Sequence, residues 1–537
     1  MKKQIIYMAT GSLLLGATLT ACNDLDTMPQ TNYVTTEQKS LALSLNPGLA
    51  SAGVVGIANT LNQFESVFSD NHADFGWPAL MMTLDLIGPD EYSANSGYNW
   101  FASSGDYSYG TIANLANQMM WYYSYKAIKS SNDVIASIPA DTDDPTLLIS
   151  AAQGYVYRAY MFFTLAQGFQ YTYVGHESLP CIPLLTDLNA LQVANDGGCP
   201  RATVEETYTQ ILNDLTTAID MLGKGEGAGK SVSDLAEIGS KRFASQAVAY
   251  GLRARVYLVM NKWKEAADDA QKAIALSGAT PFSIEEASKP TFVTSDEHNW
   301  MWCVYIDTSS RPVTTGICNW PSMMGSFTSG YASQVQVWKK ISKTLFNTIP
   351  ITDCRRGWFL DDKGNSKNLT TAQKNYLTQC KVEPYTQVKF GPYEGVINTT
   401  TNANDWPLMR VEEMYLIQAE GLGMSGDLSG GVKVLQDFVK TYRDPSYVCN
   451  AVGSEQFQNE VWRQRRIELW GEGFCYFDLL RLNKGLDRRG TGIDASWVYN
   501  VPAPLKPFLI PTMEMETNKL ITENNESWSK PNAVDDK

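Results

Sequence analysis

The sequence predicts a mainly α-helical protein, built as a tetratricopeptide-like helical repeat scaffold that carries long irregular loop insertions. Helical apolar periodicity dominates residues 40–278 and returns in the C-terminal region 406–537, which becomes irregular from Leu486 onward and ends in a polar tail, so we expect two helical regions. Between them, residues 279–405 mix short β-like runs with clusters of Gly, Pro, Asn and Thr, which are typical of loops. The repeats are therefore expected to be separated by insertions rather than stacked as a plain solenoid.

The clearest repeat is a helix pair within residues 253–276. Its alanines would let the second helix approach the first closely, while Tyr257 and Trp263 fill the remaining gap. The spacing matches the tetratricopeptide pattern at Ala254, Tyr257, Asn261, Trp263, Ala266, Ala270 and Ala273. Weaker copies are expected at residues 410–438, at 154–165 with 204–222, and at 121–138.

The N-terminus has the pattern of a lipoprotein signal. A basic start with Lys2 and Lys3 precedes a short apolar run that ends in Leu-Thr-Ala before Cys22. The run is too short for a permanent membrane span, and a small residue before cysteine suits lipoprotein processing. We expect removal of residues 1–21, acylation of Cys22 and a polar tether over residues 22–39; an ordinary signal peptide with an incidental cysteine is the alternative.

Charge and cysteine usage exclude two classes of protein. The net charge is −14, and loss of the two lysines in residues 1–21 makes it −16, which argues against a nucleic-acid or other polyanionic partner. Eight cysteines follow Cys22 without a C-x-x-C pair, scattered through a long chain. This is not a disulfide scaffold. Buried free thiols are expected, with one Cys181–Cys199 bridge as the alternative.

Catalytic motifs are absent from the sequence. None of the three histidines, His72, His176 and His298, has a second metal ligand at helical spacing, and no G-x-S-x-G elbow occurs. We therefore expect no metal, no cofactor and no catalytic residue. A glycosidase pair of carboxylates is the enzymatic alternative that abundant acidic residues leave open.

Aromatic residues in two loop regions point to ligand binding. Sugars present apolar C–H faces and hydroxyls, which flat rings and amide or carboxylate groups recognise. The clusters are Tyr92, Tyr98, Trp100, Phe101, Tyr107 and Tyr109, then Trp300, Trp302, Tyr305, Trp320 and Tyr331. We expect Trp100 to be an exposed stacking platform beside Tyr98 and Asn99, with Trp320 and Tyr331 facing the same pocket. The competing interpretation is that these rings pack the loops onto the scaffold.

Several motifs, in order along the chain, resemble the SusD/RagB family of outer-membrane nutrient-binding lipoproteins. They are Arg201–Tyr208 with Asp214-Leu215, Arg410–Glu420, Arg465–Gly473 with Phe477–Arg481, and Ile510-Pro511 with Glu514, Asn518 and Asn524. Two residues depart from the family pattern. Gln464 replaces the usual glutamate and Cys475 replaces a common arginine, both in a presumed structural ion-pair network.

The resemblance implies a helical body with tetratricopeptide-like units and a lipid anchor at the outer surface of the outer membrane. It also implies a partner, a SusC-like TonB-dependent β-barrel transporter that the protein caps like a lid. Family members capture oligosaccharides or polysaccharides, or in some cases peptides, and pass them to the barrel. The expected function is thus non-catalytic glycan capture. A peptide-binding member of the family and a pure tetratricopeptide interaction scaffold are the alternatives.

Overall fold

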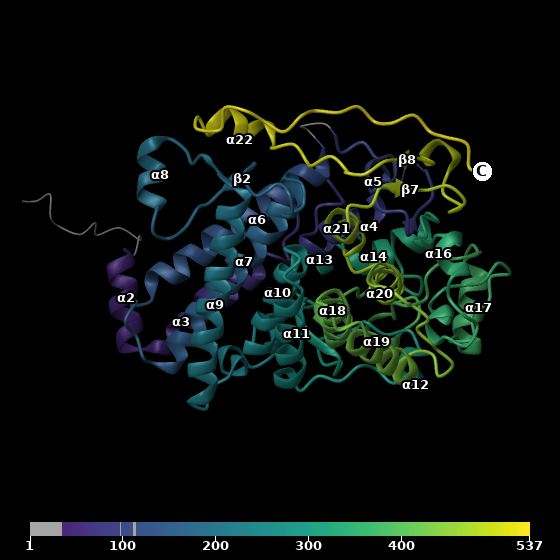
Figure 1. The fold of residues 1–537 in the computed structure, drawn as a ribbon, viewed down its shortest axis with the longest axis horizontal. Coiled ribbons are helices and arrows are strands. Elements are labelled where there is room, and N and C mark those ends of the chain that lie inside the picture. The colour runs from purple at the N-terminus through teal and green to yellow at the C-terminus, as the bar shows by residue number, and fades with distance from the viewer. Residues whose placement is uncertain (1–34, 97, 111–113) are drawn as a thin grey trace, which may run out of the picture.

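The computed structural model describes residues 35–96, 98–110 and 114–537; Cys22 and the expected signal segment therefore lie outside the described residues. Most of the body is a row of helices in which each packs on the next (Figure 1). In chain order these helices are α6 (Leu115–Ser137), α7 (Pro145–Phe169), α9 (Val204–Gly227), α10 (Gln246–Val259), α11 (Trp263–Ser277), α18 (Val411–Met424), α19 (Leu428–Tyr442) and α20 (Ser454–Glu468). A mainly α, tetratricopeptide-like scaffold is confirmed.

Side-chain caps fix where the long helices begin. Asp144 accepts hydrogen bonds from the backbone N–H groups of Thr146 and Leu147 at the start of α7. Pro145 suits the first turn because proline has no N–H that would need an acceptor. Thr203 and Glu206 form a reciprocal capping box at the start of α9. These caps satisfy N–H groups that would otherwise lack partners, so helix starts are encoded locally.

The helix pair α10–α11 has the geometry that its spacing predicts. Ala266, Ala270 and Ala273 are fully buried at the helix contact. Asn261 makes the turn with a φ of +56°, a conformation that asparagine tolerates better than most residues. The repeat assigned to residues 253–276 is confirmed.

Glycines allow the C-terminal helices to approach even more closely. A Cβ atom on Gly431 of α19 would lie 2.7 Å from the carbonyl oxygen of Ala419 on α18. On the other side of α18, a Cβ on Gly421 would lie 2.5 Å from the carbonyl oxygen of Trp263 on α11. α11 and α18 pack directly on each other although 133 residues separate them in the sequence. The row of helices is therefore not interrupted in space.

Those intervening residues form an insertion that is closed by a pair of strands. β4 (Trp300–Val304) pairs antiparallel with β6 (Trp406–Arg410), with Val304 opposite Trp406. The insertion holds short elements: α12 (Ile284–Ala287), α13 (Arg311–Thr314), α14 (Trp320–Met324), α15 (Tyr331–Gln334), β5 (Lys340–Ile341), α16 (Lys343–Asn347) and α17 (Thr371–Gln379). The expected loop-rich region thus begins and ends at neighbouring points of the scaffold.

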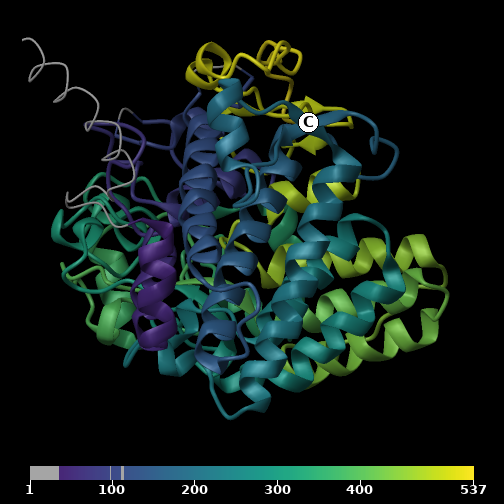
Figure 2. The same cartoon turned by 90° about the vertical axis from the view of Figure 1, so that its left-hand side faces the viewer.

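The remaining elements flank the row of helices. Before α9 in the chain come α2 (Thr36–Leu45), α3 (Ala50–Asn59), α4 (Trp77–Ile87), β1 (Glu91–Tyr92), α5 (Ala102–Gly105), β2 (Pro180–Pro183), α8 (Ala190–Asp196) and β3 (Arg201–Thr203), and of these β1 pairs with β5 of the insertion. After α20 come α21 (Cys475–Arg481), β7 (Leu486–Asp487), β8 (Asn500–Val501) and α22 (Thr512–Thr517). Figure 2 shows α2 beside α6, so a helix begins inside the segment 22–39 that we expected to be a tether.

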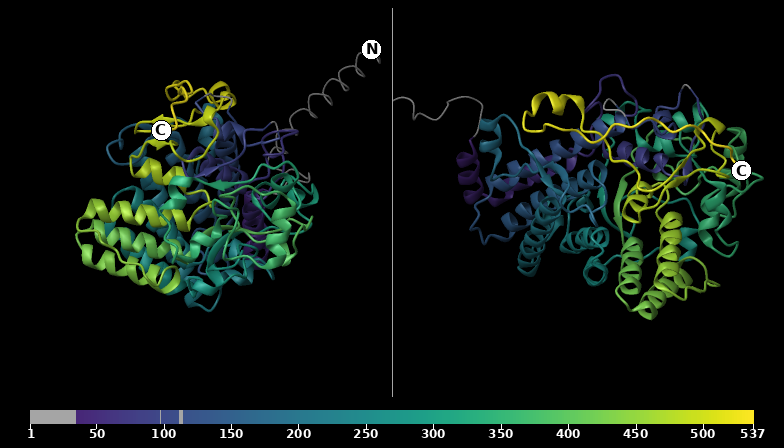
Figure 3. Two further views of the ribbon diagram at one scale, coloured as in Figure 1. Left: turned by 90° about the vertical axis from the view of Figure 1, so that its right-hand side faces the viewer. Right: turned by 45° about the horizontal axis from the view of Figure 1, so that its top comes forward.

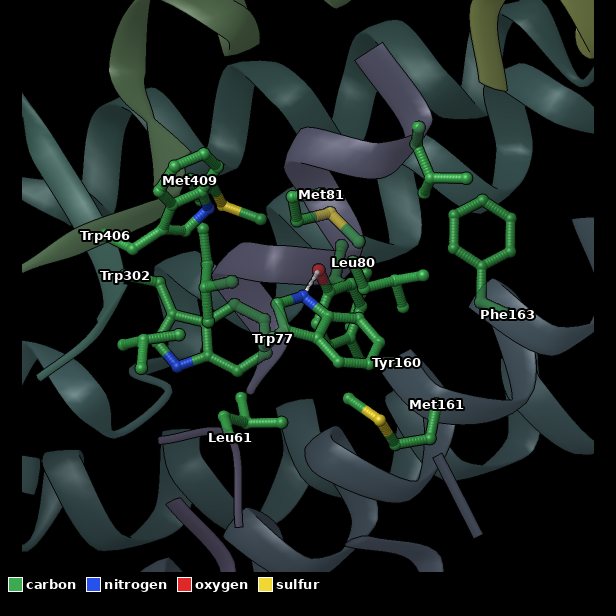
Figure 4. Close-up of a cluster of buried hydrophobic side chains, with 14 of the residues drawn as sticks. Leu61, Trp77, Leu80, Met81, Tyr160, Met161, Phe163, Trp302, Trp406 and Met409 are labelled. Atoms are coloured by element: carbon green, nitrogen blue, oxygen red, sulfur yellow. Dashed lines mark hydrogen bonds between the residues drawn. The ribbon is translucent and has the colours of Figure 1, made fainter. Parts of the chain in front are cut away.

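The centre of the hydrophobic core joins the helical row to the insertion. Trp77 of α4 donates its indole N–H to the hydroxyl of Tyr160 on α7, at 3.0 Å (Figure 4). The ring of Tyr160 also lies edge-on to Trp302 of β4, with centroids 5.1 Å apart. Trp406 of β6 closes the cluster. Each indole or phenol is buried with its apolar surface on neighbouring rings, which stabilises the junction.

Eight buried charges form a balanced cluster beside this core, which we call the charge cluster. Its members are Asp353, Arg355, Lys389, Arg410, Glu412, Arg443, Glu468 and Glu472. Glu468, at the end of α20, pairs with Arg443 at 2.7 Å, Arg410 at 3.2 Å and Arg355 at 3.3 Å. Burial alone would raise the pKa of Glu468, yet the attraction of Arg443, Arg410 and Arg355 holds the pKa well below the usual glutamate value.

The two departures from the family pattern are accommodated in this region. Gln464 accepts a hydrogen bond from Arg355 at 2.6 Å and donates to Glu460 at 3.0 Å. The thiol of Cys475 lies 3.5 Å from Asp90, which pairs with Arg466. The prediction that both positions touch a structural ion-pair network is confirmed.

Replacing Ala266 by leucine should overpack the contact between α10 and α11. We expect Ala266→Leu to lower the free energy of unfolding by about 1–3 kcal/mol, because the fully buried site has no room for three further carbons. Thermal unfolding measures the effect, with the exposed Ala275→Leu on the same helix as the matched control. Equal melting temperatures for the two variants would contradict the assigned packing.

Neutralising Glu468 should strongly destabilise the fold. We expect Glu468→Gln to cost about 3–5 kcal/mol near pH 7, since three arginines would keep their buried charge without their shared carboxylate. The low folded-state pKa gives stability above the unfolded glutamate pKa, about 4.3, that is lost as pH falls below it. The deficit of the variant should therefore shrink on acidification.

Denaturant unfolding from pH 7 to about pH 2.5 tests this pH dependence, because the stability is lost only below the unfolded glutamate pKa of about 4.3. Glu455→Gln, an exposed substitution on the same helix α20, is the matched control and should leave stability nearly unchanged at every pH. A deficit of Glu468→Gln that stays constant over the whole range would rule out the linkage.

Candidate functional site

Four ring side chains from three segments meet at the surface in what we call the aromatic patch: His72, Tyr98, Trp100 and Tyr331. The ring of Trp100 lies 4.7 Å from that of His72, with 31° between the planes. His72 in turn contacts the edge of Tyr331 and hydrogen-bonds through Nδ1 to the tyrosine hydroxyl. Tyr98 is 67% exposed and Trp100 36% exposed, so both rings present apolar surface to solvent.

A tight loop holds Tyr98 and Trp100 outward. Asn99 points inward, donates to the carbonyl of Ala94 at 2.9 Å and accepts from the backbone N–H of Phe101 at 3.1 Å. Phe101 is buried next to Phe75, with ring centroids 6.0 Å apart. The loop is thereby anchored by Asn99 and Phe101, and the residues on either side of Asn99 are left at the surface.

A buried arginine fixes the backbone behind this loop. Arg488 donates to the carbonyls of Leu86 and Ile87 at the end of α4 and to that of Gly105 at the end of α5. Burial lowers the pKa of its guanidinium to about 10, which still leaves it charged at neutral pH. One side chain thus ties the two segments that flank the loop to each other.

The C-terminal tail supports the same region from outside. It crosses the top of the molecule as an extended segment (Figures 1 and 3). Trp528 packs on Tyr107 and Tyr109, with ring centroids 5.3 and 5.0 Å apart, and leaves no room for a side chain at Gly110. Lys530 pairs with Asp106. The polar tail that the sequence indicates is therefore docked along its length.

The opposite wall of the patch comes from the insertion. The backbone N–H of Tyr331 donates to the hydroxyl of Ser322 at 2.9 Å. Asn402 donates to the carbonyls of Ser329 and Gly316, at 3.0 and 3.3 Å. Burial raises the pKa of the Tyr331 phenol, which keeps its hydroxyl protonated and able to donate.

Two predicted site residues are buried and do not form part of the exposed surface. Trp320 is buried, donates its indole N–H to the carbonyl of Asn404 at 2.7 Å and packs edge-on against Trp406 and Phe390. The expectation that it faces the pocket is wrong, because a core carbonyl satisfies its polar atom and lets the whole ring be buried. The prediction that Asn99 binds the ligand is also wrong, because both ends of its amide form hydrogen bonds with the backbone of the loop.

The competing interpretation, loop packing, holds for most other rings of the two aromatic clusters. Tyr92, Phe101, Tyr107, Tyr109, Trp300 and Trp302 are all buried. The first cluster thus contributes Tyr98 and Trp100 to the surface, and the second contributes the half-buried Tyr305 and Tyr331.

His72 is the member of the patch that the sequence did not indicate. Its partners Trp100 and Tyr331 are 28 and 259 positions away, so no spacing rule connects them. His72 was considered above only as a possible metal ligand, and its neighbours in the sequence do not predict a place in an aromatic surface.

The described residues were also examined for three other features: metal ligands, disulfides and membrane-spanning helices. No group of three or more His, Cys, Asp or Glu side chains there is arranged to hold a metal ion. Its eight cysteines are free thiols, as predicted, so the alternative Cys181–Cys199 bridge is not formed. Across residues 35–96, 98–110 and 114–537, every helix is too short or too polar to cross a bilayer.

Comparison with protein families identifies the chain. One family model, described as starch-binding and associating with the outer membrane, matches residues 58–258. A second, described as the SusD family, matches residues 328–536, so the two span about three quarters of the sequence. The chain belongs to the SusD/RagB family. This SusD-like chain matches no curated protein sequence.

Solved structures share the SusD-like fold at low sequence identity. A SusD-like carbohydrate-binding protein from Bacteroides vulgatus is 18% identical, with a TM-score of 0.69 over 88% of this chain and 97% of its own. A SusD superfamily protein from Bacteroides thetaiotaomicron is 21% identical, with a TM-score of 0.67 over 89% and 99%. A laminarin-binding SusD-like protein is 18% identical, with a TM-score of 0.59 over 89% and 99%.

Proposed function

We propose that this SusD-like protein is a non-catalytic glycan-binding lipoprotein of the cell surface that delivers oligosaccharides or polysaccharides to a SusC-like TonB-dependent transporter. The observation that carries the proposal is the aromatic patch, where Trp100 and Tyr98 stand exposed on a firmly held loop. Structural relatives described as carbohydrate-binding and laminarin-binding support the same class of ligand.

The chemistry of the patch suits a sugar ring. Stacking a pyranose on the Trp100 indole removes apolar surface from water on both partners, at about 25 cal/mol per Å² before ordering costs. The hydroxyl of Tyr331 and the imidazole of His72 lie next to that ring and can hydrogen-bond to sugar hydroxyls. A flat apolar platform beside polar groups on a rigid frame is what a neutral carbohydrate requires.

The anchor and the transporter complete the proposal. Cys22 would carry the acyl chains, and residues 23–35 would link them to α2. A family description that names association with the outer membrane supports this location. The proposed transfer of the ligand to a TonB-dependent barrel follows from the family resemblance. A purely binding role is proposed because the sequence contains none of the catalytic motifs considered above.

Replacing Trp100 by alanine should weaken glycan binding selectively. We expect at least a roughly fivefold increase in Kd, about 1 kcal/mol, with a nearly unchanged melting temperature, because the ring is partly exposed. An array of neutral polysaccharides and oligosaccharides identifies ligands, and calorimetry then compares wild type and variant.

Two control variants separate binding from stability. Trp100→Phe keeps a stacking ring and should retain most of the affinity. Trp320→Ala removes a buried ring and should cost about 3–5 kcal/mol of stability without a selective loss of ligand in the folded protein. Binding that is independent of Trp100, or selection of peptides instead of glycans, would contradict the proposed function.

Replacing Cys22 by alanine should release the protein from the membrane. The acceptor for the acyl chains is removed, so we expect Cys22→Ala to move from the outer-membrane fraction to the soluble fraction. Cys380→Ala, which changes a partly buried thiol and leaves the anchor intact, is the matched control. Continued sedimentation of Cys22→Ala with outer membranes would refute the anchor.

A further inference from the structure

A groove with a volume of about 490 Å³ lies outside the aromatic patch and shares none of its residues. Three segments line it: residues 237–241, residues 293–296 and the stretch 305–308 that follows β4. Tyr393 and Asp405, from the far end of the insertion, complete the wall. We call this feature the Tyr305 groove.

Two tyrosines give the groove its aromatic surface. Tyr305 and Tyr393 are both half-buried and both line the cavity. Tyr305 rests on the guanidinium of Arg242, 5.0 Å from its ring centroid, and on Gly239, where a Cβ would lie only 2.5 Å from the ring. Within the described chain, neither phenol hydroxyl hydrogen-bonds to a protein group, in contrast to Tyr125 and Tyr160 of the core. Both hydroxyls are thus available to a ligand.

Rigid backbone supports this surface. Asp405 accepts the N–H groups of Ile306 and Ser295, at 2.7 and 2.8 Å, and so joins two walls of the groove. Lys241, from the third wall, donates to the carbonyl of Glu297 at 2.8 Å. Preorganised walls lower the ordering cost of binding.

The polar groups of the groove favour an uncharged polyhydroxyl ligand. Four carboxylates line the groove, those of Glu237, Asp296, Asp307 and Asp405, against the single cation Lys241. This surplus of negative charge repels an anionic ligand, including an acidic sugar. Hydroxyls donate and accept, so a neutral sugar can use both carboxylates and phenols.

One short segment links the groove to the aromatic patch. Asn402 holds the carbonyl of Ser329, two residues before Tyr331, and Asp405 forms the wall of the groove. Arg311, just beyond the 305–308 wall, lies over the ring of Phe64, 5.8 Å from its centroid, in the loop that leads to His72. The insertion thus contributes a wall to each feature, and residues 402–405 contact both walls.

We propose that the Tyr305 groove is a second carbohydrate subsite, which binds a further stretch of the same neutral glycan that the aromatic patch holds. The inference rests on the proposed function and extends it from one platform to two. A polymer that touches both subsites gains apparent affinity through effective concentration, whereas a short oligosaccharide fills each subsite separately.

Calorimetry with short and long glycans tests the second subsite. The probes are laminarin, soluble starch, laminarihexaose and maltohexaose, together with any neutral glycan that the array selects. For the glycan that binds, we expect two hexasaccharides per wild-type chain and one per Tyr305→Ala or Tyr393→Ala chain. Affinity for the polymer should fall about fivefold or more in either variant. Tyr305→Phe, which keeps the ring, is the matched control.

Each outcome separates the inference from the proposed function. A single hexasaccharide per wild-type chain, with groove variants that bind the polymer normally, overturns the second subsite while Trp100→Ala still tests the first. No binding of any neutral glycan by the wild type overturns the proposed function and the inference with it. Loss of binding in Tyr393→Ala with an unchanged melting temperature supports the subsite even where Tyr305→Ala fails to fold.

Discussion

Glu468 is the group on which the architecture most depends, because three arginines from three separate parts of the chain converge on its carboxylate. Arg355 belongs to the insertion, Arg410 ends β6, and Arg443 follows α19. Each of these cations is buried, so none can find water as a substitute partner. The cluster is electrically balanced only when all the segments are in place, which makes docking of the insertion part of folding itself.

This constraint explains how a long irregular segment can carry a binding surface. The insertion leaves the helices after α11 and returns beside its starting point through the β4–β6 pair. Lys389, inside it, reaches Glu472 and the carbonyl of Trp470. Loops fixed at both ends and in the middle can present Tyr331 and Tyr305 at defined positions without regular secondary structure of their own.

Local pattern was sufficient for the helices and insufficient for the site. The alanine spacing of α10 and α11 could be predicted because contacts between adjacent helices repeat within a few residues. Trp100 and Trp320 could not be told apart, since their exposure depends on partners far along the chain, such as Asn404 for Trp320. His72 joins the patch through Tyr331, 259 positions away. Contacts of that range leave no trace in periodicity.

The docked C-terminal tail also allows an order in time. Trp528 and Lys530 brace the residues that follow Trp100, yet they lie far beyond them in the sequence. The chain can form its helical row, its insertion and its charge cluster while the loop that bears Trp100 still lacks this outer brace, because no member of the cluster belongs to the tail. The surface proposed to capture the ligand can therefore be completed after the frame that holds it.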